Sequence, residues 1–544
     1  MPHAVSMASP GFQAIILCGP GSSFSTFTAN PDENPKALLP IANRPMVWYP
    51  LEFCYRSGIT NITLICPPST STAITSALNT NPALTSLPFP RPSILAPKDL
   101  DYNTGTAELL RLPEVKSAIS SDFVLLPCDL VCELAGENLL QTWMITAASL
   151  PSILGDDAHQ PQPQSGGMGV WYDTKKVNLV KGEETDFVIT TALSSMPGTG
   201  SKTSLAPHLR NLVYSMPTDS LKDLRVEEGG LPNRHALLRS YPRTRMLSTH
   251  RDAHIYILPK WVLDIVEENP LMESVGEDVI GWWAKAGWQH GLSGKLKMDK
   301  IFKPDGKEDG DAKNGEYNSA DTYRTSSLRP PLPRNTVSTL QNGTDEGGDM
   351  TEPESYSVPP ILAYVHPPNP TGPLIRRVDT SQLLLQVSLQ LAKLPALDES
   401  TPGEASPFAH PKKLAYPEGV QQKTTIVQKD SLVAENVTVQ EKAAINSSVV
   451  GANCQIKEGA KLLQCLLMDG VVVGRSCKLT RCVIGKRAVI GDGSVLTDVE
   501  VQENLMVERK TDEKDNRLMS SEGLEATEED LQALDTAEGD VDLG

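Results

Sequence analysis

The chain has 544 residues, more than one hydrophobic core usually supports, so two or more domains are expected. Its formal net charge of −18 argues against nucleic acid or an anionic membrane as the main partner. The first ten residues lack a basic segment followed by an apolar core, and no apolar run approaches the roughly 18 residues of a membrane span. We therefore expect a cytosolic protein that is neither secreted nor embedded in a membrane.

Nine cysteines are scattered along the chain, and many lie inside apolar runs, as reduced core thiols do. Two close pairs, Cys128 with Cys132 and Cys477 with Cys482, resemble halves of a metal site. No histidine lies near either pair, so the ligand preferences of zinc predict no metal site there. We likewise predict no bound cofactor.

The amino-terminal part has the pattern of an α/β fold. Phe12 to Leu17 is a short apolar run, Met46 to Arg56 carries apolar residues at helical spacing, and Ile62 to Cys66 is a second apolar run. Strand, helix and strand in this order predict a βαβ unit with a parallel sheet. Asp122 to Leu126 and Ile361 to Val365 repeat the strand signal, and functional loops are expected where such strands end.

Composition and pattern divide the chain into five predicted segments. They are a flexible start (residues 1–10), an α/β domain (11–395) with a disordered insertion at about 304–360, a linker (396–423), a β-helix (424–505) and an acidic tail (506–544). The insertion is rich in Gly, Asp, Asn, Ser and Pro with few large aliphatic residues. The chain after Ser521 contains nine acidic residues and no Lys or Arg, which is typical of a solvated tail.

Aliphatic residues recur at steps of six between residues 433 and 500, and the phase slips by five at Val450 and at Ile484. A hexapeptide repeat of this kind predicts a left-handed parallel β-helix in which each coil stacks its aliphatic residues on the next. Ordinary antiparallel strands are the alternative, but simple alternation does not keep a period of six. The residues predicted to fill this core are Val439, Ile445, Val450, Ile456, Leu462, Leu479, Ile484 and Ile490.

A turn with two glycines, Gly19-Pro20-Gly21-Ser22-Ser23, follows the first predicted strand. Such a turn can bring backbone N–H groups close to phosphates. Glycine turns are common, so this turn alone is a weak signal.

Three further motifs make the chain resemble the sugar-nucleotidyltransferase family. Asn34 to Met46 is similar to its Pro-Lys-x-Leu-Leu-Pro segment, Tyr102 to Ala107 to its base- and sugar-facing Gly-Thr-Ala turn, and Leu126 to Asp129 to its metal-binding strand end. The resemblance implies a Rossmann-type mixed sheet and a nucleotide pocket where Lys36 faces phosphate and Asp129 binds magnesium. The pocket residues that it implies are Gly19, Gly21, Ser23, Lys36, Asn103, Gly105, Thr106 and Asp129.

This pocket departs from the enzymes of that family. Ser23 stands where the resemblance implies an arginine that neutralises the triphosphate, and Pro20 removes a backbone donor from a turn that is one residue short. Phosphoryl transfer depends on positioning and charge neutralisation, so we predict a vestigial pocket with no catalytic residue. Alternatively, Lys36 is a solvated loop lysine and Asp129 a carboxylate that caps a strand end.

A second resemblance narrows the family. His254 to Asp264, followed by Glu273 to Ile280, is similar to the gamma-subunit family of translation initiation factor 2B, the guanine-nucleotide exchange factor for initiation factor 2. The related epsilon subunits carry exchange activity in an all-helical domain, whereas this chain continues after its β-helix with a short acidic segment. The lone His254 is expected to be a strand residue of the core.

The second resemblance implies a noncatalytic subunit in a complex. Such a subunit pairs with epsilon, joins beta, delta and alpha subunits in a decamer, and helps to bind initiation factor 2 and promote GDP release, without direct contact to nucleic acid. An active nucleotidyltransferase that makes a GDP- or UDP-sugar is the alternative. A third hypothesis is a sensor that binds a nucleotide or sugar nucleotide without turnover.

Overall fold

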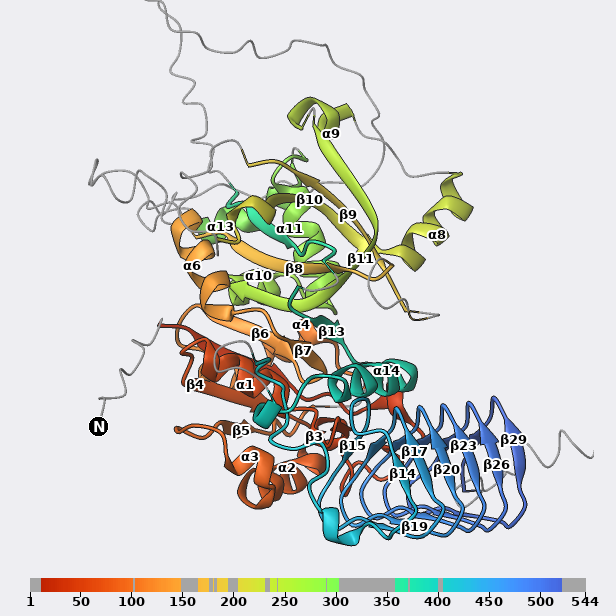
Figure 1. Ribbon diagram of the computed structural model, residues 1–544. Coiled ribbons are helices and arrows are strands. Elements are labelled where there is room, and N and C mark those ends of the chain that lie inside the picture. Colours follow the sequence, from red (N-terminus) through yellow and green to blue (C-terminus); the bar gives the residue numbers. More distant parts are fainter. Residues whose placement is uncertain are drawn as a thin grey trace, which may run out of the picture.

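The structure is a computed structural model, and it describes residues 11–100, 103–147, 165–175, 180, 183–193, 204–229, 235–241, 243–289, 291–302, 358–369, 372–399 and 405–520. An α/β domain, coloured red to green in Figure 1, is followed by the blue coils of a parallel β-helix. The predicted fold class is therefore confirmed. The predicted flexible start, the insertion from 304 to 357, Tyr102 and the chain after Ser520 lie outside the described residues.

A nine-stranded mixed sheet organises the α/β domain, in the order β5-β4-β1-β6-β11-β8-β12-β10-β9. Its strands are β1 (Gln13–Leu17), β4 (Asn61–Ile65), β5 (Ser93–Leu95), β6 (Phe123–Pro127), β8 (Gly167–Asp173), β9 (Asp186–Thr191), β10 (Leu209–Pro217), β11 (Thr244–Leu258) and β12 (Ile361–Val365). The first four strands are parallel, and β11 is antiparallel to both its neighbours β6 and β8. The predicted βαβ unit is confirmed, since α1 (Trp48–Arg56) connects the parallel pair β1 and β4.

Helices cover both faces of this sheet. Besides α1, the helices of the domain are α2 (Pro68–Thr80), α3 (Pro82–Thr85), α4 (Thr106–Arg111), α5 (Pro113–Ala118), α6 (Gly136–Ala147), α8 (Thr218–Glu228), α9 (His235–Ser240), α10 (Val262–Glu268), α11 (Ile280–Ala286), α12 (Leu292–Lys295), α13 (Met298–Phe302) and α14 (Ser381–Ala392). Two short pairs of strands complete the domain: β2 (Pro40–Ile41) with β3 (Arg44–Pro45), and β7 (Leu130–Cys132) with β13 (Ile375–Arg377).

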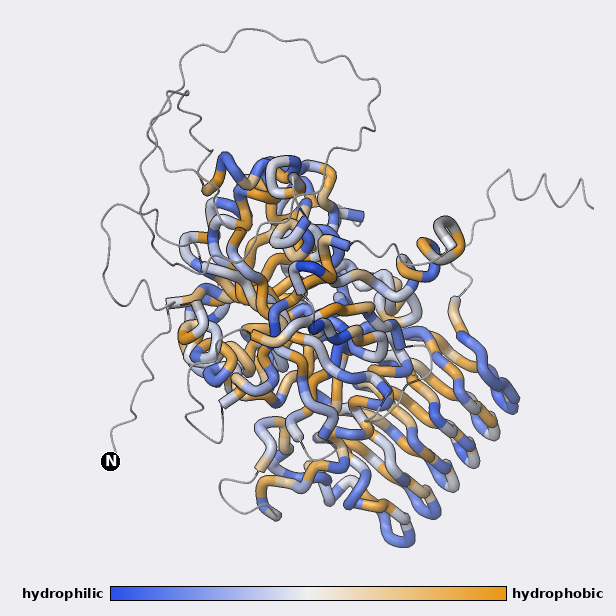
Figure 2. The backbone as a smooth tube through the Cα atoms, turned by 90° about the horizontal axis from the view of Figure 1, so that it is seen from above, coloured by the Kyte–Doolittle hydropathy of each residue, from blue (hydrophilic) through white to orange (hydrophobic). Residues whose placement is uncertain are grey.

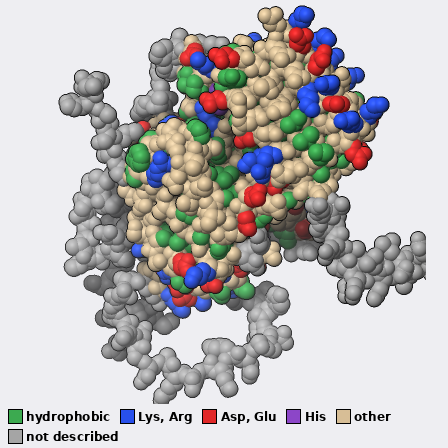
Figure 3. Space-filling view, turned by 90° about the horizontal axis from the view of Figure 1, so that it is seen from below, with side chains coloured by type: hydrophobic (Ala, Val, Ile, Leu, Met, Phe, Trp, Pro, Cys, Tyr) green, Lys and Arg blue, Asp and Glu red, His purple; other side chains and the backbone are tan. Residues whose placement is uncertain are grey.

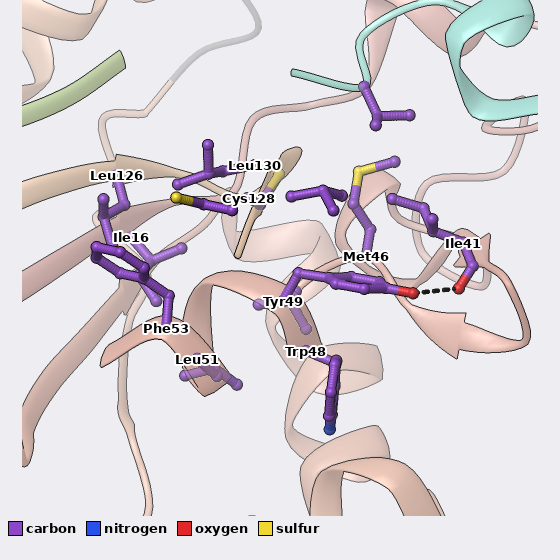
Figure 4. Packing of buried hydrophobic residues seen from close by; sticks show 14 of the residues in the cluster. Ile16, Ile41, Met46, Trp48, Tyr49, Leu51, Phe53, Leu126, Cys128 and Leu130 are labelled. Carbon is purple, nitrogen blue, oxygen red and sulfur yellow. Dashed lines mark hydrogen bonds between the residues drawn. The ribbon is translucent and has the colours of Figure 1, made fainter. Parts of the chain in front are cut away.

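Successive residues of β1 point to opposite faces of the sheet and so fill two separate cores. Ile16 joins the core that contains Tyr49 and Phe53 of α1, whereas Ile15 joins the core that contains Trp283 of α11. Figure 4 shows the first of these cores, where the hydroxyl group of Tyr49 donates a hydrogen bond to the carbonyl of Ile41 at 2.8 Å.

The β-helix has three parallel sheets whose strands stack from coil to coil. One contains β14 (Thr425–Ile426), β17 (Ala444–Asn446), β20 (Lys461–Leu463), β23 (Lys478–Thr480), β26 (Val495–Thr497) and β29 (Asp512–Lys514). The second contains β15 (Leu432–Val433), β18 (Val449–Val450), β21 (Leu466–Leu467), β24 (Val483–Ile484), β27 (Glu500–Val501) and β30 (Arg517–Leu518). The third contains β16 (Thr438–Val439), β19 (Gln455–Ile456), β22 (Val472–Val473), β25 (Val489–Ile490) and β28 (Met506–Val507).

From Leu432 onward, residues that stack on each other in adjacent coils are 17 positions apart, as Ile445 on Leu462 and Leu462 on Leu479, whereas the first coil is longer and places Ile426 19 positions before Ile445. A coil of 17 residues has two sides of six residues and one of five, so the phase slip seen at Val450 and Ile484 is a property of the coil itself. The eight residues predicted for the core are all buried within one cluster. Hydrophobic and hydrophilic stretches alternate along the coils in Figure 2.

The β-helix is longer than predicted at both ends. Leu414 already pairs with Val433, inside the segment predicted as linker, and β28, β29 and β30 follow residue 505. The boundary predicted between the β-helix and the acidic tail, at residue 506, is therefore wrong, because strands of the β-helix continue to Leu518. Backbone pairing continues from Leu496 to Glu513, although a carboxylate has replaced the aliphatic residue of the repeat. The aliphatic residues of the repeat thus end one coil before the backbone hydrogen bonds between coils do.

One face of the β-helix packs on the α/β domain beside α14 (Figure 1). Its outward residues Leu432, Val449, Leu466 and Val483 are buried in the same core as α1, and the next two residues of this row are Glu500 and Arg517. Aliphatic side chains thus occupy this row where it is covered, and charged ones follow. Among the described residues, no helix has both the length and the apolar character needed to cross a membrane.

Candidate functional site

The glycine turn after β1 folds back on itself. Gly21 has a φ of 91°, which favours glycine, and its carbonyl accepts hydrogen bonds from the Phe24 N–H at 2.8 Å and the Thr28 hydroxyl at 2.9 Å. A Cβ atom at Gly21 would lie 3.1 Å from the Cβ of Lys36, so the turn packs directly on the lysine. Ser23, in the position where the resemblance implies an arginine, is exposed to solvent.

Lys36 and Asp129 form a buried ion pair. Lys36 Nζ lies 2.7 Å from Asp129 Oδ2, and the Asp129 side chain is 2% exposed. Burial alone would raise the pKa of Asp129, but Lys36 and Arg377 outweigh it and hold this pKa well below its usual range. Burial would likewise lower the pKa of Lys36, yet the attraction of Asp129 leaves it raised. Both groups are therefore charged at neutral pH.

A third charged residue, Arg377, comes from a distant part of the chain and lies beside the carboxylate of Asp129. Strand β13 pairs antiparallel with β7, which places Arg377 opposite Leu130 and its Nε atom 3.6 Å from Asp129 Oδ1. Arg377 also lies 4.0 Å from Asp379, which accepts a hydrogen bond from the buried Arg251. Lys36, Asp129, Arg377, Asp379 and Arg251 thus form one charged cluster of alternating sign, which we call the ion cluster.

Sequence reasoning found Lys36 and Asp129 but missed the other three members of the ion cluster. The available signal was the run Arg376-Arg377-Val378-Asp379, which places three charged residues in and directly after β13, just before α14. Buried charges are rare unless they are paired, so such a run beside a core helix indicates an internal ion network.

The ion cluster does not fit a magnesium ion at Asp129. Both carboxylate oxygens already face a cation, and an incoming divalent ion would meet the positive charges of Lys36 and Arg377 at close range. Magnesium binds through carboxylates and water, and here both oxygens of the carboxylate already face a cation. Within the described part of the chain, no group of three or more His, Cys, Asp and Glu side chains could hold a metal ion.

The Gly-Thr-Ala turn is closed by the segment that precedes the π-helical turn Val275–Val279. The Ala107 N–H donates to the Glu273 carbonyl at 2.8 Å, and the Thr106 hydroxyl accepts from the Val275 N–H at 2.8 Å. A Cβ atom at Gly105 would lie 2.2 Å from the Glu273 oxygen, so only glycine allows this approach. Asn103 is exposed. The predicted pocket residues thus fall into two groups, one at Lys36 and one at Glu273.

His254 lies in β11, as predicted, but at an irregularity in the pairing of β11 with β8, with a φ of 52°. Its side chain is 27% exposed and lines a cavity of about 110 Å³ together with Asp252, Glu277 and Arg377. Burial and Arg377 lower the pKa of His254 well below its usual value, so the imidazole is neutral. Burial, followed by repulsion from Asp186, raises the pKa of Asp252 to about 7.

Known proteins match both domains. A family model described as nucleotidyl transferase matches residues 14–174, and one described as the EIF2B subunit epsilon LbH domain matches residues 415–512. Translation initiation factor eIF2B subunit gamma of Schizosaccharomyces pombe is 27% identical over 291 residues, which is 54% of this chain and 55% of that protein.

The subunit of the same name from Caenorhabditis elegans is 23% identical over 295 residues, 54% of this chain and 59% of that protein. The chain spans about half the length of the curated relatives that it matches. The chain is thus similar to eIF2B subunit gamma over about half of its length, and its two domains are similar to a nucleotidyl transferase and to the eIF2B epsilon LbH domain, in that order.

Proposed function

We propose that the chain is a noncatalytic subunit of the guanine-nucleotide exchange factor for translation initiation factor 2. In this role it pairs with an epsilon-type subunit in the cytosol, within a complex with beta, delta and alpha subunits, to bind the GTPase and promote GDP release. The observation that carries the proposal is the ion cluster, in a chain whose relatives are named eIF2B subunit gamma.

The charges of the ion cluster support a degenerate pocket. A triphosphate in the pocket would need a free cation, but Lys36 and Arg377 face Asp129, and Ser23 brings no charge. Withdrawing Lys36 would leave a buried carboxylate with one distant partner, at a cost of about 3–5 kcal/mol. The loss of one electrostatic contact to a transition state already slows an enzyme by about 10²–10³. The pocket is therefore unsuited to phosphoryl transfer.

The β-helix supports a role in assembly. Its stacked sheets form a rigid body with flat faces, and one face is already used to pack on the α/β domain. The remaining faces offer extended surfaces for other subunits.

The exchange role can be tested with initiation factor 2 that carries a fluorescent GDP. We expect the purified chain alone to leave the rate of GDP release unchanged, and the chain together with an epsilon subunit to release GDP faster than epsilon alone. Release by the chain alone at the rate of the assembled pair would contradict the noncatalytic role. An absence of any effect on the epsilon subunit would contradict the partnership.

An active nucleotidyltransferase is the second candidate, favoured by the family-model match and by the presence of Lys36 and Asp129. Pyrophosphate release with sugar phosphates, nucleoside triphosphates and magnesium tests it. We expect no turnover above the level of an Asp129→Asn variant. Turnover that this substitution abolishes would favour the enzyme. Calorimetric titration with nucleotides and sugar nucleotides tests the sensor hypothesis, which heat of binding without turnover would favour.

A further inference from the structure

Two lysines stack directly on each other in the first sheet of the β-helix, the sheet that begins with β14. Lys461 of β20 pairs in register with Lys478 of β23, and neighbouring strands lie about 4.8 Å apart. Both lysine side chains are exposed. Like charges that lie directly opposite each other destabilise a sheet, so this lysine pair lowers the stability of the coils that carry it.

Elsewhere in the β-helix, ion pairs join charged residues of adjacent coils: Lys442 with Glu458, Arg481 with Asp498, and Glu500 with Arg517. The lysine pair has no such compensation. Among the residues that the structure describes, no carboxylate forms an ion pair with Lys461 or with Lys478. A sequence breaks a local rule in this way mostly at functional sites, so the two ammonium groups indicate a contact with carboxylates of another molecule.

The surface around the lysine pair suits contact with a protein. Leu463 lies on the same side of β20 as Lys461, since side chains alternate along a strand, and it is 41% exposed. Thr480 lies beside Leu463 in the next coil. The face thus combines an apolar contact with charged and hydroxyl groups, as protein interfaces do. The net charge of −18 repels nucleic acid, so the anionic partner is a protein.

The first sheet is open to such a partner. The second sheet, which begins with β15, provides the outward residues that are buried against the α/β domain, and Figure 1 shows the strands of the first sheet on another side of the coils. In Figure 3, where the β-helix lies at the upper right, Lys and Arg side chains gather with Asp and Glu along its outer margin. Charged groups of a partner can therefore reach this part of the β-helix.

We propose that Lys461 and Lys478 bind an acidic surface of a partner subunit, which places an aliphatic side chain against Leu463. The partner is a subunit of the same exchange factor, so this inference rests on the proposed function. A carboxylate between the two ammonium groups removes their repulsion, and the assembled β-helix recovers the stability that the lysine pair takes from the isolated chain. The lysine pair thus favours assembly.

Cross-linking of the purified subunit complex with a carbodiimide tests the contact directly. The reagent activates a carboxylate and joins it to an amine that touches it, so an amide bond forms while the carboxylate oxygen leaves with the reagent as a urea. We expect mass spectrometry to find amide bonds from Lys461 and Lys478 to Asp or Glu residues of another subunit.

The variant Lys478→Glu separates a role in assembly from a role in folding. In the isolated chain this change places opposite charges in the stack, so the melting temperature should not fall. The affinity for the other subunits should fall at least about tenfold, because a carboxylate then faces the acidic surface. Lys478→Arg keeps the charge, and Lys98→Glu makes the same charge reversal at an exposed lysine of the α/β domain. Both controls should assemble like the unchanged chain.

Three outcomes would contradict these expectations in different ways. A complex that assembles without cross-links from either lysine, and with equal affinity of Lys478→Glu, would overturn this inference and leave the proposed function standing. Cross-links from Lys461 and Lys478 to carboxylates of this same protein would overturn it as well, because the acidic surface would not belong to a partner subunit. A chain that binds none of the other subunits would contradict the proposed function, and this inference with it.

Discussion

The hydroxyl group of Thr26 donates a hydrogen bond to the carboxylate of Glu500 at 3.2 Å, which ties the segment after the glycine turn to the β-helix. The same carboxylate accepts from Ser381 at the start of α14 and lies 3.4 Å from Arg517. Glu500 follows four aliphatic residues in its row, at the place where the α/β domain stops covering the coils. Glu500 therefore contacts both the segment after the glycine turn and the start of α14.

Replacing Glu500 by alanine is expected to loosen this junction. The hydroxyl groups of Thr26 and Ser381 lose their acceptor, so the free energy of unfolding should fall by about 1–3 kcal/mol. Hydrogen exchange should rise in residues 24–34 and not in the core of the sheet. Glu508→Ala, in an exposed corner of the same β-helix, is the matched control and should leave both measurements unchanged. Unchanged exchange in residues 24–34 would mean that Glu500 does not hold this segment.

Replacing Asp129 by asparagine is expected to destabilise the protein strongly. The change leaves the buried Lys36 without a counter-charge and Arg377 with Asp379 alone, and breaking a buried ion pair in this way costs about 3–5 kcal/mol. Denaturation by urea measures the loss. Glu458→Gln, which breaks the fully exposed ion pair with Lys442, should have no measurable effect. Equal stability of Asp129→Asn and the unchanged chain would mean that the ion cluster is not formed in solution.

The pKa of Asp252 predicts a specific dependence of stability on pH. Burial, with Asp186 as a second cause, raises the pKa of this carboxyl to about 7 in the folded chain, against about 3.9 in an unfolded one. Between these values the folded state binds the proton and the unfolded state does not, so the contribution of Asp252 to stability falls as pH rises from about 4 to 7.

The size of this effect follows from the same linkage. The free energy of unfolding should lose about 3 kcal/mol between pH 5 and pH 8 through Asp252, and Asp252→Asn should remove that part of the slope. Asp264→Asn, at a half-exposed position of α10, is the control that should keep it. Urea denaturation at several pH values measures the slope. Identical slopes in the unchanged chain and in Asp252→Asn would show that the carboxyl is ionised throughout.

The elements that the sequence predicts well are those with a local period. The alternation and spacing of apolar residues indicate β1, α1, β4, β6 and β12, and the period of six indicates the β-helix, because each of these patterns reports burial within a few residues. The family motifs bring Gly21, Lys36 and Asp129 together in the sequence argument, and the structure places them in contact.

The rest of the site depends on contacts between distant residues. Arg377 reaches Asp129 only because the three-residue strands β13 and β7 pair, and neither strand carries a period that a sequence pattern can reveal. The closure of the Gly-Thr-Ala turn by Glu273 depends in the same way on a backbone contact between segments that are far apart in the sequence. The local sequence thus predicts the strands and helices around the pocket, whereas contacts between distant segments determine which charged groups lie in it.

The outward-pointing residues on the β-helix face that packs on the α/β domain can be used to test how the two domains are joined. Leu466 points out of its coil and is fully buried in the core of the α/β domain, whereas Leu463, three residues earlier in the same coil, is 41% exposed. Leu466→Ala removes side-chain contacts from two domains at once and should lower the free energy of unfolding by about 2–5 kcal/mol.

Leu463→Ala makes the same chemical change on a solvated face and should cost less than about 0.5 kcal/mol. Because the inward residues Leu462 and Leu467 are unchanged in both variants, the coil itself stays packed. Calorimetry of the two variants therefore separates domain packing from β-helix stability. If Leu466→Ala and Leu463→Ala melt at the same temperature, the covered face contributes nothing to stability, and the two domains fold as independent units.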